Sequence, residues 1–457
     1  MKADRRATEA LHGEPGGSAP GAVTARPRRW LGSPGPALHG SARPTVSAGT
    51  RLRIALISPV DPGIGTYTYE LVRGLCAAGV ECDVYTGFNA WITSLPRICA
   101  VYPVLGRALI RQRSALISAG APPAGITQSR RPLLQPMLRN ASAIRLVRRA
   151  YLSVELALWL KIRGYDAVWT QWPEMDEGSI TFWRAARVLR LPVVHTAHNV
   201  LPHERVARDH DRYAGVFRRS RAVIVHSEAA RGILLREYPY LASRAIASRH
   251  GLYTTYPRLP DRRFAMRERL RLAPETNAVL LYGGVRPYKN VDSLIDALAA
   301  DNSGSWVLVV AGHESGYGDS GGPDPLARTR RLVAERGLQD RVRLLPGPFS
   351  VEETSELFEA SDIVALPYLE SYGSGLLLLA MSFGKLVVAT RTGGMDEYLQ
   401  DYRAHILMEG AAGADVLAAL RRAQAMLPIA VSDAPRPPAF EWSSIVADLI
   451  PRLESIC

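Results

Sequence analysis

A basic loop at residues 283–290 (GGVRPYKN) directly follows an apolar run of strand length. Gly283 and Gly284 would let the chain turn there, because glycine tolerates backbone angles that other residues disfavour. Arg286 and Lys289 would then stand at a strand end, where a guanidinium and an ammonium can bind a diphosphate. Cations on loops are often simply solvated, but this position favours an anion site.

A second loop of small residues, at 366–375 (LPYLESYGSG), precedes an apolar helical stretch. Small residues at such a junction let backbone N–H groups surround a phosphate. Within the loop, the Glu370 carboxylate could accept hydrogen bonds from sugar hydroxyls. The alternative is an ordinary strand-to-helix turn that carries an exposed glutamate.

The first loop of this kind, residues 58–66 (SPVDPGIGT), contains Gly63 and Gly65. Glycines at a strand-to-helix junction permit positive φ and the close approach of a ligand, and a helix N-terminus favours an anion or a sugar hydroxyl. The third glycine of a dinucleotide fingerprint is missing, so a tight turn explains the pattern equally well.

Three histidines, His195, His198 and His203, fall within nine residues after another apolar run. Spacings of three and five residues on a loop could suggest metal ligation. However, no cysteine and few carboxylates accompany them. We therefore expect no metal, and predict a polar loop lining a cleft, with one histidine contacting the reacting group.

Alternating strands and helices must position these four loops. From residue 51 onward, nearly continuous apolar runs alternate with helical segments, which predicts parallel sheets covered on both faces. The polar segment 254–277 divides the pattern into two series. The expected strands are Arg53–Ser58, Glu81–Thr86, Asp166–Gln171, Leu191–Thr196, Ala222–Ser227, Ala278–Gly283, Trp306–Ala311, Val342–Pro346, Ile363–Pro367 and Leu386–Ala389. The expected helices are Tyr67–Ala78, Ile144–Ile162, Ile180–Leu189, Glu228–Glu237, Val291–Ala299, Leu326–Arg336, Val351–Ala360, Leu376–Phe383, Ala414–Met426 and Trp442–Ile456.

The predicted fold is therefore α/β, with two Rossmann-like, doubly wound parallel-sheet domains that face each other across a cleft. Residues 51–255 and 256–435 would form the two domains. Residues 436–457 would form a C-terminal helix that packs back on the N-terminal domain. Residues 1–50 lack any apolar period, and we expect a disordered tail there. Ligands should bind at the carboxyl ends of the strands.

In this order, the four loops resemble the motifs of glycosyltransferase family 4, retaining enzymes of GT-B fold. The resemblance covers residues 52–450. Its most specific parts are Thr-x-His followed by Asn-Val-Leu-Pro-His-Glu at 196–204, Val-His-Ser-Glu at 225–228, His250-Gly251, Arg-Pro-Tyr-Lys at 286–289, and the 366–397 block with Gly393-Gly394.

The resemblance implies that the N-terminal domain binds the acceptor and the C-terminal domain binds a nucleotide-sugar donor. Arg286 and Lys289 would neutralise the departing diphosphate, and His198 would lie beside the reacting sugar. Together these three residues form the implied catalytic set. This electrostatic work needs no metal and no cofactor, because the nucleotide diphosphate sugar is a co-substrate.

The resemblance also assigns residues to each substrate. The implied donor-binding residues are Gly63, Gly65, Gly284, Glu370, Ser374, Gly375 and Leu376, the last three through backbone N–H groups that contact the phosphates. The acceptor-side candidates are His195, Asn199 and His203.

Two departures from the family pattern bear on nucleotide recognition. The usual motif has two glutamates with seven residues between them, but Glu370 is followed eight positions later by Leu378. The carboxylate that commonly holds the ribose is therefore absent. The usual arginine, five positions before the lysine, is Gly284, and Arg286 stands three positions before it instead. A branch of the family with a Ser-Gly loop and an Arg-Pro-Tyr-Lys loop is similar in both respects.

Most of the net charge of +13 comes from residues 94–165, which hold twelve basic residues and one acid, a net +11. Basic residues beside an amphipathic helix favour anionic lipid. We therefore expect a cytoplasmic protein attached peripherally to the inner face of the cell membrane; a solvated arginine-rich face is the alternative. Aromatic residues are not interleaved with the arginines, so we expect no nucleic-acid partner.

The predicted reaction moves a sugar from a nucleotide diphosphate sugar to a glycan, lipid-linked or small-molecule acceptor, with retention. Two alternatives stay open. The missing second glutamate suggests a catalytically inactive scaffold of the same fold that binds glycans or nucleotides. A nucleotide-sugar epimerase would need its own acid/base residues, and the sequence offers no obvious set.

Overall fold

The structure is a computed structural model that describes residues 52–58, 62–86, 100–102, 141–171, 180–203, 208–313, 325–430 and 437–456. The tail predicted over residues 1–50 lies outside these ranges, as do residues 103–140 of the basic segment. None of the helices in the described ranges has the length and apolar character needed to cross a membrane.

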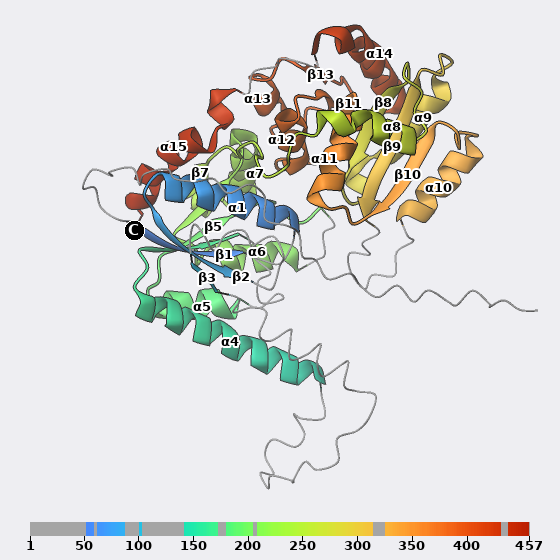
Figure 1. Ribbon diagram of the computed structural model, residues 1–457. Helices are drawn as coiled ribbons and strands as arrows, with labels where there is room; N and C mark the ends of the chain where they lie inside the picture. The colour runs from blue at the N-terminus through green and yellow to red at the C-terminus, as the bar shows by residue number, and fades with distance from the viewer. Residues whose placement is uncertain are drawn as a thin grey trace, which may run out of the picture. The chain divides into compact units, whose positions relative to one another are not determined.

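Within the described residues, seven parallel strands form the first sheet, in the order β3-β2-β1-β4-β5-β6-β7 (Figure 1). The order reverses between β1 and β4, the place where doubly wound sheets bind ligands at their carboxyl ends. The strands are β1 (Arg53–Ser58), β2 (Glu81–Thr86), β3 (Ala100–Tyr102), β4 (Ala167–Thr170), β5 (Val193–Thr196), β6 (Ala222–Val225) and β7 (Ala245–Ala247).

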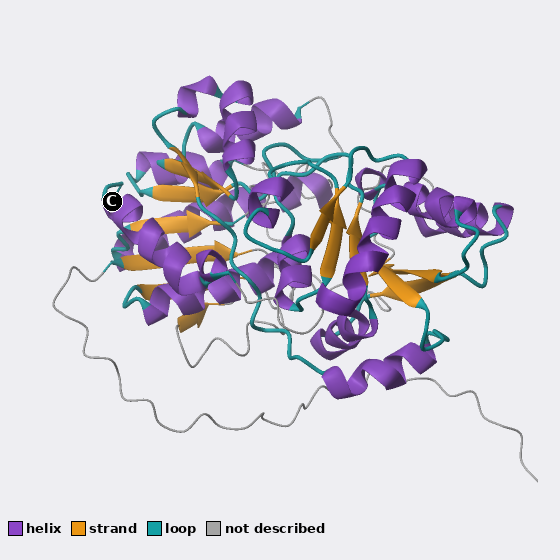
Figure 2. Ribbon diagram, turned by 90° about the horizontal axis from the view of Figure 1, so that it is seen from above, coloured by secondary structure: helices purple, strands orange, loops and turns teal. Residues whose placement is uncertain are grey.

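Different helices cover the two faces of the first sheet (Figure 2). Along β1, Ala55 and Ile57 pack with α4, α5, α6 and α7, while Ile54 and Leu56 pack with α1 and α15. This alternation is expected of a strand buried on both faces. The helices are α1 (Pro62–Ala77), α4 (Ala141–Arg163), α5 (Thr181–Val188), α6 (Asp209–Phe217), α7 (Glu228–Glu237) and α15 (Trp442–Glu454). We call this sheet with these helices the first lobe.

The second lobe is a sheet of six parallel strands in the described ranges, ordered β10-β9-β8-β11-β12-β13, with helices packed around it in one apolar core. Its order reverses between β8 and β11. The strands are β8 (Asn277–Tyr282), β9 (Trp306–His313), β10 (Val342–Gly347), β11 (Ile363–Leu366), β12 (Leu386–Ala389) and β13 (His405–Leu407). The helices are α8 (Arg263–Arg269), α9 (Val291–Ala300), α10 (Pro325–Glu335), α11 (Val351–Ala360), α12 (Gly375–Ser382), α13 (Met395–Leu399) and α14 (Gly413–Ala430).

The last helix, α15, returns to the first lobe and packs against α1 (Figure 1). Val446 and Leu453 are fully buried there. The Trp442 indole N–H donates to the carbonyl of Leu252 at 2.8 Å, which ties the helix to the segment leaving the first lobe. A Cβ on Gly251 would stand 2.5 Å from the Trp442 ring, so this contact requires glycine.

Helix α1 also anchors the segment that connects the two lobes. Glu70 is fully buried and accepts hydrogen bonds from the backbone amides of Thr254 at 2.5 Å and Thr255 at 2.9 Å. Arg73 pairs with the same carboxylate at 3.3 Å. A buried carboxylate with several donors is held in one place, so the connection begins from a fixed point.

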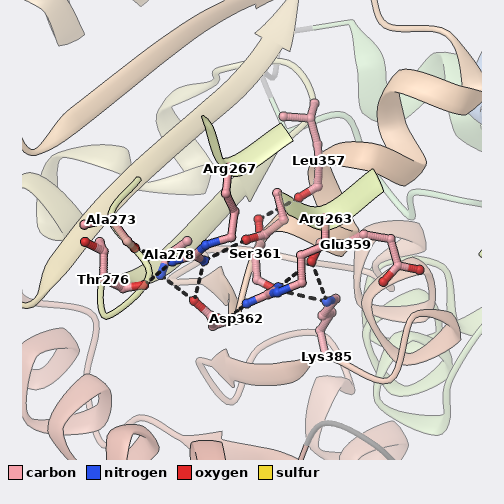
Figure 3. A network of polar contacts seen from close by, with 11 residues as sticks. Arg263, Arg267, Ala273, Thr276, Ala278, Leu357, Glu359, Ser361, Asp362 and Lys385 are labelled. Atoms are coloured by element: carbon pink, nitrogen blue, oxygen red, sulfur yellow. Dashed lines mark hydrogen bonds and ion pairs between the residues drawn. The ribbon is translucent and has the colours of Figure 1, made fainter. Parts of the chain in front are cut away.

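A buried polar network aligns the amino ends of β8 and β11 (Figure 3). Asp362, just before β11, accepts from the backbone amide of Ala278 in β8 at 2.8 Å and from Arg267 at 3.2 Å. Arg267 is 5% exposed and donates to three further backbone carbonyls, those of Ala273, Thr276 and Ala360. Because this network fixes where both strands begin, it also helps to fix the loops at their carboxyl ends.

The structure confirms the predicted α/β class with two parallel sheets, and adds elements that the sequence pattern missed. These are β3, β7, β13, α6, α8 and α13. The three strands have three residues each, and α8 and α13 have seven and five, too short for an apolar period to become visible. Helix α6 (DHDRYAGVF) begins with four polar residues, which obscure its period.

Replacing Arg267 with Met should lower the free energy of unfolding by about 3 kcal/mol, because Asp362 and three carbonyls would lose a buried donor. Urea unfolding measures the change. Arg262→Met is the matched control: Arg262 pairs with Glu356 at 3.3 Å, but its side chain is 66% exposed, and its loss should cost less than about 1 kcal/mol. Equal losses in the two variants would contradict the role assigned to the network.

Candidate active site

The carboxyl ends of β8 and β11 bring the basic loop and the small-residue loop together. The backbone amide of Leu369 donates to the carbonyl of Tyr288 at 2.8 Å and joins the two loops directly. Sheet order reverses between these two strands, and open parallel sheets bind ligands at such a point. The predicted cations and the predicted phosphate loop therefore share one edge of the second sheet.

Lys289 ends the single 3₁₀ turn Pro287–Lys289 and is folded back over its own strand, with 7% of its surface exposed. Its Nζ donates to the carbonyl of Tyr282, the last residue of β8, at 2.9 Å. A Cβ on Gly283 would stand 2.8 Å from that Nζ, and Gly283 has a φ of 84°. Glycine is therefore required for the lysine to fold back in this way.

Burial, together with the positive charge of Arg286, lowers the pKa of Lys289 to about 7. Near neutral pH, the ammonium and amine forms are both populated. An anion bound beside these two residues would stabilise the ammonium and raise this pKa. The arrangement would suit a site that becomes fully charged when an anion binds.

Helix α12 begins in the small-residue loop. The Ser374 hydroxyl caps the helix by accepting from the amide of Leu377 at 3.2 Å. Within the described residues, the amides of Gly375 and Leu376 make no hydrogen bond, as is usual in a first helical turn, so they can donate to a phosphate. A Cβ on Gly375 would stand 2.9 Å from the hydroxyl of Tyr253, so this helix start also lies close to the connecting segment.

Leu378 stands in α12 at the position of the missing second glutamate. It is 1% exposed and packs in the apolar core of the second lobe. The leucine that replaces the usual glutamate is therefore a core residue, and this position offers no carboxylate to a ribose.

Glu370 and His203, which were predicted for different substrates, meet in the structure. The Tyr372 hydroxyl donates to Oε1 of Glu370, and Oε2 of Glu370 lies 4.0 Å from Nδ1 of His203. The His203 ring stacks on Tyr288 of the basic loop, with centroids 3.9 Å apart and planes at 14°. The loop after β5 of the first lobe is thereby joined to the predicted donor side.

Three histidines that follow strands of the first lobe gather around Tyr67 of α1. His198 follows β5, His226 follows β6 and His250 follows β7. Their ring centroids lie 4.8, 5.2 and 4.9 Å from that of Tyr67. We call these four residues the histidine group.

Burial keeps the imidazoles of the histidine group neutral at physiological pH. It lowers the pKa of His226 to about 4 and that of His250 to about 3. The pKa of His198 is held well below its ordinary value, first by burial and then by the neighbouring imidazoles. A neutral ring can accept or donate one hydrogen bond at each nitrogen, according to its tautomer.

Sequence reasoning identified His198 but gave His226 and His250 no role of their own. A signal was present, because each follows the end of a parallel strand by one to three residues. Carboxyl ends of parallel strands lie along one edge of the sheet, so these residues could have been grouped on that ground.

His195 does not join this group. It is completely buried, with its ring centroid 6.1 Å from Trp183 and 5.8 Å from Phe217, and its Nδ1 lies 2.7 Å from the hydroxyl of Thr170. Strand residues alternate between faces, which directs His195 into the core under α5 and α6. Burial lowers its pKa to about 3. A side chain in this position cannot touch an acceptor, whereas Asn199 is partly exposed beside His198.

Gly63 and Gly65 lie inside α1 and not in the loop before it. The helix begins at Pro62, a residue favoured at the first helical position because its φ is preset and it needs no N–H partner there. The predicted start at Tyr67 was therefore wrong, and the glycines have helical backbone where positive φ had been expected. They remain in the turns of α1 that precede Tyr67.

Helix α13 of the second lobe contacts the histidine group. The Glu397 carboxylate accepts hydrogen bonds from the first two backbone amides of α7, at 2.9 and 2.6 Å, where the helix dipole favours a carboxylate. The Tyr398 hydroxyl donates to the carbonyl of His226 and accepts from the amide of His250 at 2.9 Å. The two lobes therefore meet beside the predicted site.

Among the described residues, no three His, Cys, Asp or Glu side chains are grouped so as to hold a metal ion.

Comparison with known proteins gives two family matches. The profile described as Glycosyltransferase Family 4 matches residues 62–247, and the profile described as Glycosyl transferases group 1 matches residues 262–423.

The similar proteins include enzymes named D-inositol 3-phosphate glycosyltransferase. The one from Xylanimonas cellulosilytica is 30% identical over 400 residues, which are 80% of this chain and 88% of that protein. The one from Salinispora tropica is 28% identical over 379 residues, 76% of this chain and 70% of that protein. A shorter match, to the Geodermatophilus obscurus enzyme, is 32% identical over 42% of this chain and 43% of that protein.

Solved structures show the same fold at low sequence identity. A glycosyltransferase from Rickettsia africae has a TM-score of 0.63 at 15% identity, covering 89% of this chain and 99% of its own. Anabaena HepE in complex with UDP-glucose has a TM-score of 0.60 at 17% identity, covering 89% and 98%. With its two parallel-sheet lobes of GT-B type and these relatives, the chain belongs to glycosyltransferase family 4.

Proposed function

We propose that this glycosyltransferase moves a sugar from a nucleoside diphosphate sugar to an acceptor hydroxyl, with Arg286 and Lys289 binding the diphosphate as it leaves. The observation that carries the proposal is the burial of Lys289 beside Arg286 at the reversal point of the second sheet. Two adjacent cations with restricted access to water are most stable when an anion binds between them. The HepE structures in complex with UDP and UDP-glucose support a nucleotide donor.

In this mechanism, negative charge grows on the diphosphate as its bond to the sugar breaks. The guanidinium and the ammonium stabilise that charge more than they stabilise the intact donor, which lowers the barrier. The amides of Gly375 and Leu376 would donate to the same phosphates. The proposal includes retention at the transferred carbon. It also includes independence of metal ions, because the two side-chain cations supply the positive charge.

The acceptor side of the proposal places the acceptor against the first lobe, near His198, Asn199 and His203. A small molecule rich in hydroxyls is supported by the relatives that are named for D-inositol 3-phosphate. A glycan or lipid-linked glycan acceptor is supported by an exposed surface on α4.

That surface is an apolar stripe along α4, which lies beside α5 in Figure 1. Tyr151, Leu158 and Ile162 are 67%, 45% and 79% exposed, and their spacing places them on one side of the helix. Residues 94–165, which include this helix, carry a net charge of +11. Exposed apolar side chains within a basic segment fit the surface of an anionic membrane. We propose peripheral attachment through this stripe.

Lys289→Ala should lower kcat/KM for sugar transfer by about 100-fold or more, because a cation aimed at the leaving group is removed. Mass spectrometry with UDP-, GDP- and ADP-sugars measures the change, and EDTA should leave the wild-type rate unaltered. Arg421→Ala, which removes an exposed cation of α14 outside the proposed sites, is the control. If the wild type bound none of these nucleotides in calorimetry, the inactive-scaffold alternative would replace this proposal.

Nucleotide binding should take up a proton above neutral pH. The free protein lowers the pKa of Lys289 to about 7, and the bound diphosphate raises it, so the complex holds more protons than the free protein. Affinity for the diphosphate should therefore fall as pH rises above about 7, by up to about tenfold per pH unit. Calorimetry in buffers of different ionisation enthalpy detects the proton. Lys289→Arg keeps its charge at every pH and should abolish the uptake; persistence of the uptake would assign it to another group.

The triple variant Tyr151→Ser, Leu158→Ser, Ile162→Ser should bind vesicles of phosphatidylglycerol and phosphatidylcholine at least about tenfold more weakly, because apolar area is lost from the contact. Flotation at physiological salt measures binding. Phe264→Ser is the matched control, since Phe264 is 80% exposed on α8 of the second lobe. Absence of wild-type binding, or an equal loss in the control, would remove the membrane proposal.

A further inference from the structure

A chain of hydrogen-bonding groups runs through the histidine group, from Gln171 at the end of β4 to Ser248 after β7. Oε1 of Gln171 lies 3.2 Å from Nε2 of His198. Nδ1 of His198 lies 3.2 Å from Nε2 of His226, and Nδ1 of His226 lies 3.3 Å from the carbonyl oxygen of Ser248. Gln171 is completely buried, His226 is 4% exposed and His198 is partly exposed, so water has restricted access to these contacts.

The number of protons in this chain constrains its chemistry. Both ends present an oxygen acceptor, and two neutral imidazoles have one N–H each. The three contacts, Gln171–His198, His198–His226 and His226–Ser248, would then have only two N–H protons between them. In one contact, two lone pairs would face each other. The amide nitrogen of Gln171 meanwhile has no hydrogen-bond partner among the described residues. A half-turn of an amide exchanges its oxygen and nitrogen with little change in shape, and here it would place a donor against Nε2 of His198.

A third proton on the two imidazoles would also complete the chain, but the surroundings oppose it. Burial lowers the pKa of both His198 and His226. Burial also lowers the pKa of the neighbouring histidines and raises that of the neighbouring tyrosines, so none of these groups supplies a negative charge at neutral pH. They are His195, His250, Tyr67 and Tyr398.

We propose that Gln171 and His226 are positioning residues that fix His198 in its neutral tautomer with the proton on Nδ1. The Gln171 amide donates to Nε2 of His198, and the Nδ1–H of His198 donates to Nε2 of His226. His226 in turn donates to the Ser248 carbonyl. Both ring nitrogens of His198 are then engaged by the protein, so the ring acts as a fixed dipole and carries no proton to or from a substrate. The inference rests on the proposed function for the place of His198 beside the sugar.

Two-bond ¹H–¹⁵N spectra of the histidine-labelled full chain, assigned with single-histidine variants, report each tautomer. We expect the Nδ1–H form for wild-type His198 across neutral pH. His226→Leu removes the acceptor and should shift His198 toward the Nε2–H form. His226→Gln keeps an acceptor oxygen within reach and should restore Nδ1–H. His250→Leu is the control, because it removes a neighbouring imidazole that lies outside the chain.

Gln171→Glu tests the other end of the chain. A carboxylate can accept but not donate, so His198 should gain a second proton and its pKa should rise into the measurable range. In transfer assays, His226→Leu should lower kcat about tenfold, the effect of one misdirected buried hydrogen bond, and change the donor KM less than about threefold. His226→Gln should recover most of that loss.

The outcomes separate the inference from the function on which it rests. An Nε2–H or doubly protonated His198 in the wild type would overturn the inference, as would an unchanged tautomer in His226→Leu. If the tautomers behave as expected but the wild type transfers no sugar from any donor, the hydrogen-bond chain is supported and the proposed function fails.

Discussion

A lysine held away from water beside an arginine is the constraint on which the proposed donor side of this molecule depends. Each cation raises the electrostatic cost of the other, and burial increases that cost because little solvent screens the pair. Lys289 reaches this position only because Gly283 leaves room for its Nζ and the Tyr282 carbonyl accepts from it. The strand beneath is held at its opposite end by Asp362. The fold thus holds Lys289 where burial and a neighbouring cation lower its pKa, and in the proposed function a diphosphate bound there would raise that pKa again.

The loop before α13 makes two contacts at positions where no side chain would fit, one within the second lobe and one with the first lobe. A Cβ on Gly393 would stand 2.0 Å from the carbonyl oxygen of Ser371, and one on Gly394 would stand 2.5 Å from the Ser227 hydroxyl. Both glycines have φ in the left-handed region, at 58° and 80°. This backbone geometry places α13 so that Glu397 reaches α7. The loop before α12 and the histidine group are therefore positioned by the same few residues.

Much of this architecture could be predicted from the sequence, because long buried strands and helices show a clear periodic pattern of apolar residues. The basic loop, the Ser-Gly loop and His198 were found from residue type and strand-end position, and the structure places each at the carboxyl edge of its sheet. His195 was misjudged because strand alternation, which buries it, was not applied to the residues before the loop. The contacts of Gln171, His226 and Glu397 join segments that are far apart in the chain, and no local pattern specifies such pairings.

Helix α15 completes the apolar face under α1, although it is synthesised after all the other described elements of both lobes. Trp442, Val446, Leu449 and Leu453 share one cluster with Ile54 and Leu56 of β1. During translation, the second lobe has every segment of its own core before this helix leaves the ribosome. The first lobe, although made earlier, keeps an uncovered apolar surface until then. The core of the second lobe can therefore be completed before that of the first. A ribosome stalled before residue 442 would expose this uncovered apolar surface, to which chaperones bind.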